Sequence, residues 1–227
     1  MRKQWITYII LLLLVPVTIW VGVTVFDDRK YLFIATVIVI LTMIPFLLTF
    51  EKKKASIRYM VIIAVMTALS VAGRFLFAAI PGFKPVTAIV ILTAVYFGAE
   101  ASFLVGALTA FISNIYFGHG PWTPFQMFAW GMTGFIFGLP YIRGMLMKSK
   151  ALLIISGLFA GAFFSLVMDI WTVISMDGMF NVTRYIAAVS LSMPFMVTYA
   201  VSNVVFLLLT VKPVGGTLGR IKTKYGI

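Results

Sequence analysis

Apolar runs separated by short charged or Gly/Pro-containing breaks constrain this chain more than any other feature. Eight such runs lie at about 5–26, 31–50, 57–80, 85–98, 100–117, 123–140, 151–175 and 187–211. The longer runs have the ~20 apolar residues that a helix needs to cross the ~30 Å hydrocarbon core of a bilayer. Only 11% of the residues are charged and the mean hydropathy is +1.10, which is unlike a water-soluble domain. We therefore expect an all-α polytopic membrane protein with about eight transmembrane helices.

The basic residues indicate how the chain is oriented. A formal net charge of +12 could suggest nucleic-acid binding, but the charges lie in short segments between the apolar runs. If the N-terminus is inside, the inner segments hold Arg2, Lys3, Lys52, Lys53, Lys54, Arg58, Arg143, Lys148, Lys150, Lys212, Arg220, Lys222 and Lys224. The outer segments then hold only Arg29, Lys30, Lys84 and Arg184. This asymmetry predicts that both termini are cytoplasmic and that the bilayer, not a nucleic acid, is the partner of this surface.

The first two runs differ from the others because they contain almost no interior polar group. They end at the charged segment 51–54. The first run follows a basic start, like a signal peptide, but it is long and has no small-x-small cleavage site, so we interpret it as a retained anchor. We expect residues 1–54 to form a transmembrane hairpin and residues 55–227 to form a six-helix core with a cytoplasmic basic tail.

The turn within residues 114–130 is the clearest candidate for a site. Its helix-breaking residues are Gly118, Gly120, Pro121 and Pro124, and it contains the single histidine, His119. Once the next helix begins, Trp122, Gln126 and Trp130 recur every fourth residue and share a face. An amide between two indoles suits a site for a flat polar molecule. The alternative is an aromatic anchor at the membrane–water interface.

Ionisable residues within the core helices support a site near the outer side. Arg74, Trp130 and Asp169 are each expected ~9–10 Å below the outer boundary, with Asn114 and Gln126 slightly shallower. Runs four and five are short, so the outer loops that carry Lys84 and His119 are expected to dip into the membrane beside protein or water. Intramembrane charges usually mark sites. The alternative is an Arg74–Asp169 ion pair that only fixes helix packing. Tyr199 and Asn203 are expected to form interhelical hydrogen bonds nearer the inner half.

Small residues at helical spacing predict close helix contacts. Ala64, Ala68 and Ala72 lie four apart on one face, and Gly134 and Gly138 form a second pair. Such residues let another helix approach closely, either within this chain or in a partner.

Several kinds of activity lack their sequence signature. The segment 215–220 lacks the Gly-Lys-Ser/Thr ending of a phosphate-binding loop. One histidine and no cysteine give no recognisable metal cluster. No nucleophile–base pair can be identified, and Asp169 is the only carboxylate deep in a core helix. These features argue against an enzyme and against an autonomous proton-driven transporter.

Residues 57–211 resemble the S component, the substrate-capturing membrane subunit, of energy-coupling factor (ECF) vitamin transporters. The resemblance rests on Ala64-Val65-Met66-Thr67-Ala68, Pro81-Gly82-Phe83-Lys84-Pro85-Val86, Gly106-Ala107, Ser113-Asn114, Phe117-Gly118-His119-Gly120-Pro121-Trp122-Thr123-Pro124, Ala129-Trp130-Gly131 and Ser202-Asn203-Val204-Val205-Phe206. It implies a six-helix fold that binds a vitamin near the outer face of a bacterial cell membrane. It also implies that an Ala-x-x-x-Ala surface docks on a transmembrane coupling subunit driven by two cytoplasmic ATPases. ATP and Mg would then be used by those partners, with no cofactor bound by the chain itself. The N-terminal hairpin departs from this pattern.

The pattern is most similar to the cobalamin branch of that family, while the riboflavin and queuosine-precursor branches stay open. The predicted substrate-binding residues are Arg74, Lys84, Asn114, His119, Trp122, Gln126, Trp130 and Asp169, and the predicted docking residues are Ala64, Ala68 and Ala72. Because the site lacks a cluster of basic residues, a heavily phosphorylated ligand is not expected. The rival classes are an intramembrane enzyme acting on lipids and a secondary transporter with inverted repeats.

Overall fold

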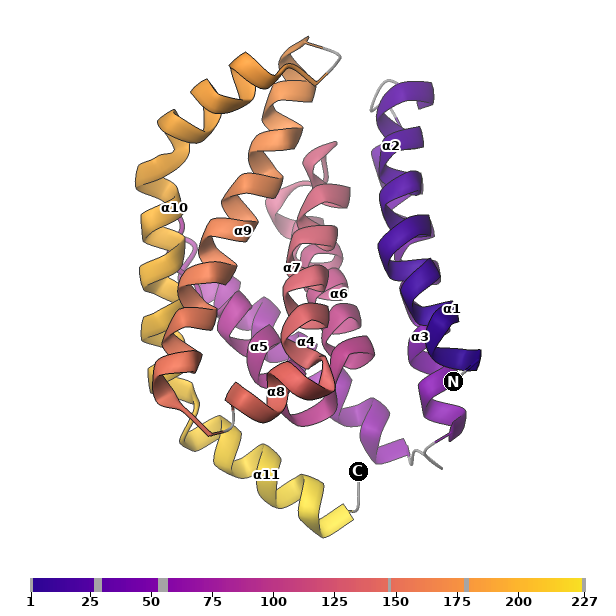
Figure 1. The fold of residues 1–227 in the computed structure, drawn as a ribbon, viewed down its shortest axis with the longest axis vertical. Helices are drawn as coiled ribbons and strands as arrows, with labels where there is room; N and C mark the ends of the chain where they lie inside the picture. The colour runs from indigo at the N-terminus through magenta and orange to yellow at the C-terminus, as the bar shows by residue number, and fades with distance from the viewer. Residues whose placement is uncertain (1, 27–29, 53–56, 147, 178–179, 226–227) are drawn as a thin grey trace.

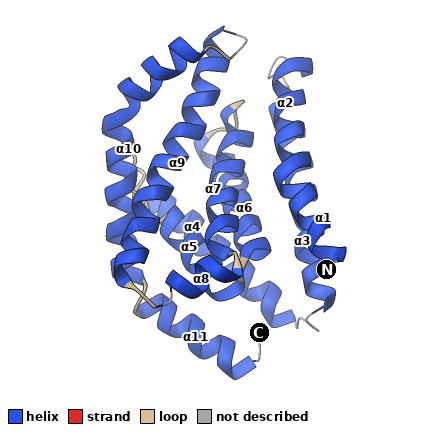
Figure 2. Cartoon of the chain, viewed as in Figure 1, coloured by secondary structure: helices blue, strands red, loops and turns tan. Residues whose placement is uncertain are grey.

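The computed structural model describes residues 2–26, 30–52, 57–146, 148–177 and 180–225, which form helices joined by short loops, with no strand in these ranges (Figure 2). The elements are α1 (Arg2–Ile9), the π-helical turn η1 (Ile10–Leu14), α2 (Val15–Phe26), α3 (Tyr31–Lys52), α4 (Ile57–Leu76), α5 (Val86–Phe97), α6 (Ala99–Phe117), α7 (Trp122–Gly138), α8 (Pro140–Leu146), α9 (Lys150–Asp177), α10 (Val182–Thr210) and α11 (Pro213–Tyr225). Each of the eight predicted runs contains a helix, which confirms the all-α class.

Membrane-length helices occur throughout the chain. Five described segments are long and apolar enough to cross a bilayer, namely Trp5–Phe26, Tyr59–Leu76, Ala99–Phe117, Lys150–Met176 and Val182–Thr210. Phe33–Ile44 and Val86–Phe97 are apolar but shorter. The chain is therefore a polytopic membrane protein. Two helices differ in their bounds from the predicted runs: α4 ends at Leu76, inside the run 57–80, and α10 begins at Val182, ahead of the run 187–211. The Asn181 side chain caps α10 by accepting from the Arg184 N–H.

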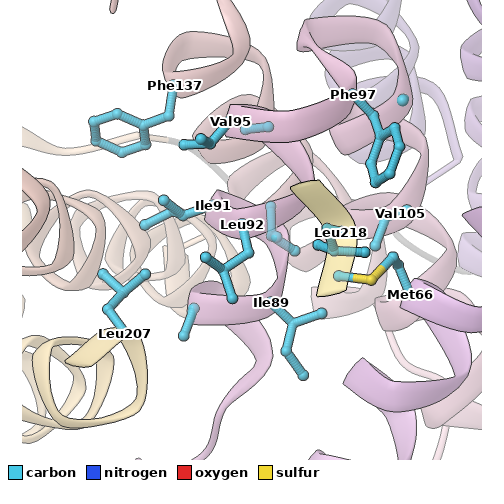
Figure 3. Packing of buried hydrophobic residues seen from close by; sticks show 14 of the residues in the cluster. Met66, Ile89, Ile91, Leu92, Val95, Phe97, Val105, Phe137, Leu207 and Leu218 are labelled. Carbon is cyan, nitrogen blue, oxygen red and sulfur yellow. The ribbon is translucent and has the colours of Figure 1, made fainter. Parts of the chain in front are cut away.

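Helix α5 lies at the centre of the helical bundle. Its residues are buried almost without exception, and α4, α6, α7 and α10 pack around it. Figure 3 shows this core from close by, with Ile91 and Leu92 of α5 near Leu207 of α10. Leu218 of α11 also belongs to this cluster. The predicted basic tail is therefore partly a packed helix, and Lys222 donates to the Tyr96 carbonyl at 2.9 Å.

Helices α6 and α7 approach each other closely because glycines line their contact. A Cβ on Gly106 would lie 2.6 Å from the Trp130 carbonyl oxygen, and one on Gly134 would lie 2.7 Å from the Ser102 backbone. The Ser102 hydroxyl donates to the Gly134 carbonyl at 2.7 Å. The Gly134–Gly138 pair therefore packs within this chain, against α6, and Gly106 of α6 lets the Trp130 backbone approach closely.

The N-terminal hairpin and the α9–α10 pair form the two flanks of the molecule (Figure 1). Helix α3 packs against α6 and α7, and α2 packs on α3. Helices α9 and α10 pack along each other and extend beyond the turn that precedes α7 (Figure 1). Helix α10 is curved in this view and has Pro194 in its interior, a residue that removes one helical hydrogen bond.

Candidate functional site

A buried polar network joins α4, α6 and α7. The Arg74 guanidinium donates from Nη1 to Ser113 Oγ and to Asn114 Oδ1, the latter at 2.7 Å. Asn114 Nδ2 in turn donates to Thr123 Oγ1 and to Gln126 Oε1, each at 2.9 Å. Arg74, Asn114 and Gln126 are all buried, so these hydrogen bonds replace water that the groups would otherwise bind.

The turn between α6 and α7, residues 118–121 and here called the Gly/Pro turn, brings this network together. Gly118 ends α6 with a φ of +90°, a conformation that glycine adopts without a side-chain penalty. The chain then reverses, and α7 begins at Trp122. Thr123 Oγ1 accepts from the Gly120 N–H at 3.2 Å, so the same hydroxyl holds the turn and contacts Asn114. The turn thus places the first residues of α7 beside the last residues of α6.

Lys84 enters the same region from the loop between α4 and α5. Its backbone is held by Ser202 of α10: the Lys84 N–H donates to Ser202 Oγ at 2.8 Å, and that hydroxyl donates to the Lys84 carbonyl at 3.2 Å. Ser202 lies in the last third of α10, so the loop reaches well into the bundle. This geometry agrees with the expectation that the loop dips inward.

Aromatic rings surround the two cationic side chains. The Arg74 guanidinium carbon lies 4.5 Å from the Phe117 ring centroid and 5.4 Å from that of Trp130. The Lys84 ammonium lies 5.7 Å from the Trp130 centroid and 5.6 Å from the Tyr199 centroid. Such contacts attract a cation to a ring face, so the Trp130 ring interacts with both Arg74 and Lys84.

Trp130 is held by stacking as well as by the α6 contact. Its ring stacks on Phe164 of α9, with centroids 5.3 Å apart and planes 14° apart, and only 1% of the residue is exposed. Phe164 also meets Tyr199 edge-on at 5.1 Å. Tyr199 therefore contributes its ring to the site, whereas the sequence suggested an interhelical hydrogen bond. Asn203 does form the expected interhelical bond, donating to the Gly157 carbonyl at 3.2 Å.

Two further aromatic residues lie near the start of α7. Trp122 meets Trp171 of α9 edge-on at 5.7 Å, and the buried Trp171 Nε1 has no hydrogen-bond partner among the described residues. His119 lies 5.2 Å from the Phe111 ring, and its buried Nδ1 is likewise without a described partner. Burial lowers the pKa of His119, so this imidazole is neutral near pH 7.

Asp169 is not paired with Arg74. Asp169 Oδ2 accepts from Ser192 of α10 at 2.6 Å, whereas Arg74 is bonded to the two side chains on α6. The alternative of an Arg74–Asp169 ion pair is therefore wrong. Asp169 is buried and links α9 to α10 through Ser192.

The structure brings some predicted residues together and separates others. Arg74, Asn114 and Gln126 share one network, and Lys84 joins it through Trp130, while Trp122 and Asp169 contact other partners. Eight residues of this region were not predicted from the sequence to belong to the site: Ser113, Phe117, Thr123, Phe164, Trp171, Ser192, Tyr199 and Ser202. Intramembrane polarity could have indicated the serines, but the aromatic partners are visible only in three dimensions.

The predicted docking residues lie on an open face of α4. Ala64, Ala68 and Ala72 are all exposed, as are the neighbouring Val65 and Leu69. The face is therefore available to a partner helix.

An apolar cavity of about 430 Å³ lies apart from the polar network, between α2, α7 and α9. Its lining includes Trp20, Phe125 and Ile170. Among the described residues, no group of three histidine, cysteine or acidic side chains could hold a metal ion.

Comparison with known proteins gives one finding. A family model described as "ECF-type riboflavin transporter, S component" matches residues 54–215, more than two thirds of the chain. No curated protein and no solved structure matches. The matched range contains the polar network and the exposed alanines, and the N-terminal hairpin lies outside it.

Proposed function

This chain belongs to the family of ECF-type riboflavin transporter S components, and we propose that it captures a vitamin at the outer face of a bacterial cell membrane for ATP-driven import. Members of this family are substrate-binding subunits of transporters, and we expect no catalysis by the chain itself. The proposed orientation has both termini in the cytoplasm, on the basis of the positions of the basic residues.

The observation that carries the proposal is the convergence of polar and aromatic groups beneath the Gly/Pro turn. Arg74 and Lys84 come from different segments and meet at the Trp130 ring, and Asn114 of a third segment accepts a hydrogen bond from Arg74. A few convergent polar groups among aromatic side chains are the usual composition of a small-molecule site. The turn and the loop of Lys84 are irregular segments, which suits a site that must open to admit its ligand.

For the substrate, we propose cobalamin as the first candidate and riboflavin as the second. Cobalamin is rich in amides, which need amide and indole partners such as Gln126 and Trp122. Riboflavin is supported by the description of the matched family and by the flat ring system that it could place against aromatic side chains. A queuosine precursor is a third compound to include in binding assays.

The proposed partners are a transmembrane coupling subunit and two cytoplasmic ATPases, which would use ATP and Mg. The exposed face of Ala64, Ala68 and Ala72 supports docking of a coupling-subunit helix. We further propose that the hairpin of residues 1–54 is an addition to a six-helix core, since the family match begins at residue 54.

Uptake into proteoliposomes tests this function. The chain would be reconstituted alone, and in complex with a coupling subunit and its ATPases, and supplied with labelled cobalamin or riboflavin. We expect the chain alone to bind its vitamin, and only the complete complex to transport it when ATP is present. Substantial uptake by the chain alone, or an inability to associate with any coupling subunit, would contradict the proposal.

A further inference from the structure

Two cationic side chains lie near one indole, and neither has a carboxylate partner among the described residues. The Arg74 guanidinium and the Lys84 ammonium lie 5.4 Å and 5.7 Å from the Trp130 centroid. Arg74 is buried and Lys84 is half-buried. Cations at such a position are costly unless an anion balances them, and the aromatic rings offset only part of that cost.

No described carboxylate supplies this balance. The chain has six acidic residues, and among these the described side chains are those of Glu100 and Asp169. Glu100 lies in the first turn of α6, at the end of the helix opposite to Asn114. Asp169 accepts from Ser192 and forms no ion pair with either cation. The side chains of Asp27, Asp28, Glu51 and Asp177 lie outside the described part of the chain.

Both cations also have N–H donors that form no hydrogen bond with the described residues. Arg74 has five N–H groups, and its described hydrogen bonds all come from Nη1. The Lys84 ammonium has three, none with an acceptor among the described residues; its ring contacts are with Trp130 and Tyr199. A ligand oxyanion between the two side chains would accept charge-assisted hydrogen bonds from each.

The side chain of Lys84 is not what holds its loop in place. Ser202 binds the Lys84 backbone N–H and carbonyl, so the loop keeps these two contacts whatever the side chain is. The ammonium is thus directed to Trp130 and Tyr199 by a backbone that is fixed independently. This arrangement fits a group positioned for a ligand.

We propose that the substrate of this site carries an oxyanion, a carboxylate or phosphate group, which binds between Lys84 and Arg74 against Trp130. The inference rests on the proposed function and narrows its substrate class. It agrees with the phosphodiester of cobalamin and with a phosphorylated flavin, and it disfavours riboflavin itself and a cationic queuosine precursor. Two cations suit a single oxyanion, in line with the expectation that a heavily phosphorylated ligand would not bind.

Matched ligand pairs test the inference by calorimetry on the purified full chain. The pairs are riboflavin 5′-phosphate and riboflavin, cobalamin and cobinamide (which lacks the phosphodiester and its base), and nicotinate and nicotinamide. We expect the oxyanion-bearing member of at least one pair to bind about tenfold or more tightly than the member that lacks the oxyanion, because hydrogen bonds to charged groups contribute at this level. Phosphate-bearing and carboxylate-bearing ligands are thereby distinguished.

Variants assign the preference to Lys84. Lys84→Met removes the ammonium and shortens the side chain by one heavy atom. It should remove most of the preference, so that the two members of the pair bind within about twofold of each other. Lys84→Arg should keep the preference, and Lys148→Met, at an exposed position far along the chain, should change nothing. Elution as a single species in size-exclusion chromatography checks that each variant is folded.

The possible failures are distinguishable. Equal affinity for both members of every pair, an unchanged preference in Lys84→Met, or no binding of any oxyanion-bearing member would overturn the oxyanion inference. Binding of a neutral vitamin together with ATP-dependent uptake by the complex would leave the proposed function intact. Failure to associate with a coupling subunit would count against the function itself.

Discussion

Arg74 on α4 donates a hydrogen bond to Asn114 Oδ1 on α6 at 2.7 Å, and this contact fixes how the Asn114 amide is used. With its oxygen occupied by a cation, the amide directs its nitrogen to Thr123 and Gln126 on α7. One side chain, completely buried, therefore joins three helices around the candidate site.

Replacing Asn114 should weaken both stability and ligand binding. In Asn114→Leu the amide is lost, and Arg74, Thr123 and Gln126 each lose a partner in a buried setting. Each unsatisfied buried group costs about 1–3 kcal/mol, and a charged group costs more. We expect a lower melting temperature in detergent and at least a tenfold loss of vitamin affinity, measured by calorimetry.

Thr109→Val is the matched control on the same helix. Thr109 is also completely buried, but its hydroxyl bonds only to the Val105 carbonyl one turn earlier, at 2.7 Å. The control should have much smaller effects on melting temperature and affinity. Similar losses in the two variants would show that the Asn114 network has no special role.

The sequence predicted the helices well because a bilayer requires continuous apolar segments. It did not predict α8 and α11, which are short and contain glycine and basic residues, and so resemble loop and tail. Leu218 illustrates why α11 was not predicted. Its neighbours in sequence are polar or glycine, yet it belongs to the same buried cluster as Met66.

The candidate site was predicted less completely, because helical spacing gives a face but not its contacts. Trp122, Gln126 and Trp130 share one spacing on α7, yet each contacts a different residue. Gln126 is bonded to Asn114, and the two indoles pack against Trp171 and Phe164 of α9. The cost of an intramembrane charge correctly drew attention to Arg74 and Asp169. The partners of Arg74, which are neutral side chains on α6, could not be predicted from that cost.

The close contact of α6 and α7 gives a second prediction. A methyl group at position 134 would meet the Ser102 backbone at 2.7 Å, so Gly134→Ala should force the two helices apart and displace Trp130. Overpacking of this kind costs about 1–3 kcal/mol. We expect a lower melting temperature and weaker ligand binding, followed by thermal unfolding and calorimetry.

Gly144→Ala in α8 provides the control for this variant, because nothing lies within 4 Å of the added methyl group. Alanine favours a helix over glycine, so this change should be neutral or slightly stabilising. If Gly134→Ala were as stable as Gly144→Ala, the α6–α7 contact would be looser than described.

The orientation in the membrane can be tested with cysteine labelling, since the chain contains no cysteine of its own. Phe180 and Lys148 are both exposed and lie in turns at the two ends of α9. With the cytoplasmic termini predicted by the basic residues, an impermeant thiol reagent should label Phe180→Cys in intact cells. It should label Lys148→Cys only after the membrane is opened. The reverse pattern would invert the proposed topology and place the candidate site on the inner side.

The last prediction concerns docking on the coupling subunit. Ala64 and Ala68 are exposed on α4, so leucine at both positions adds volume outside the core and should leave folding and vitamin binding unchanged. A partner helix that needs close approach would be held off, because small residues are what permit such packing in membranes. We expect Ala64→Leu/Ala68→Leu to lose co-purification with the coupling subunit and ATP-dependent uptake, while Ala187→Leu, at an exposed position of α10, keeps both. Normal assembly and uptake by the double variant would move the docking surface away from this face of α4.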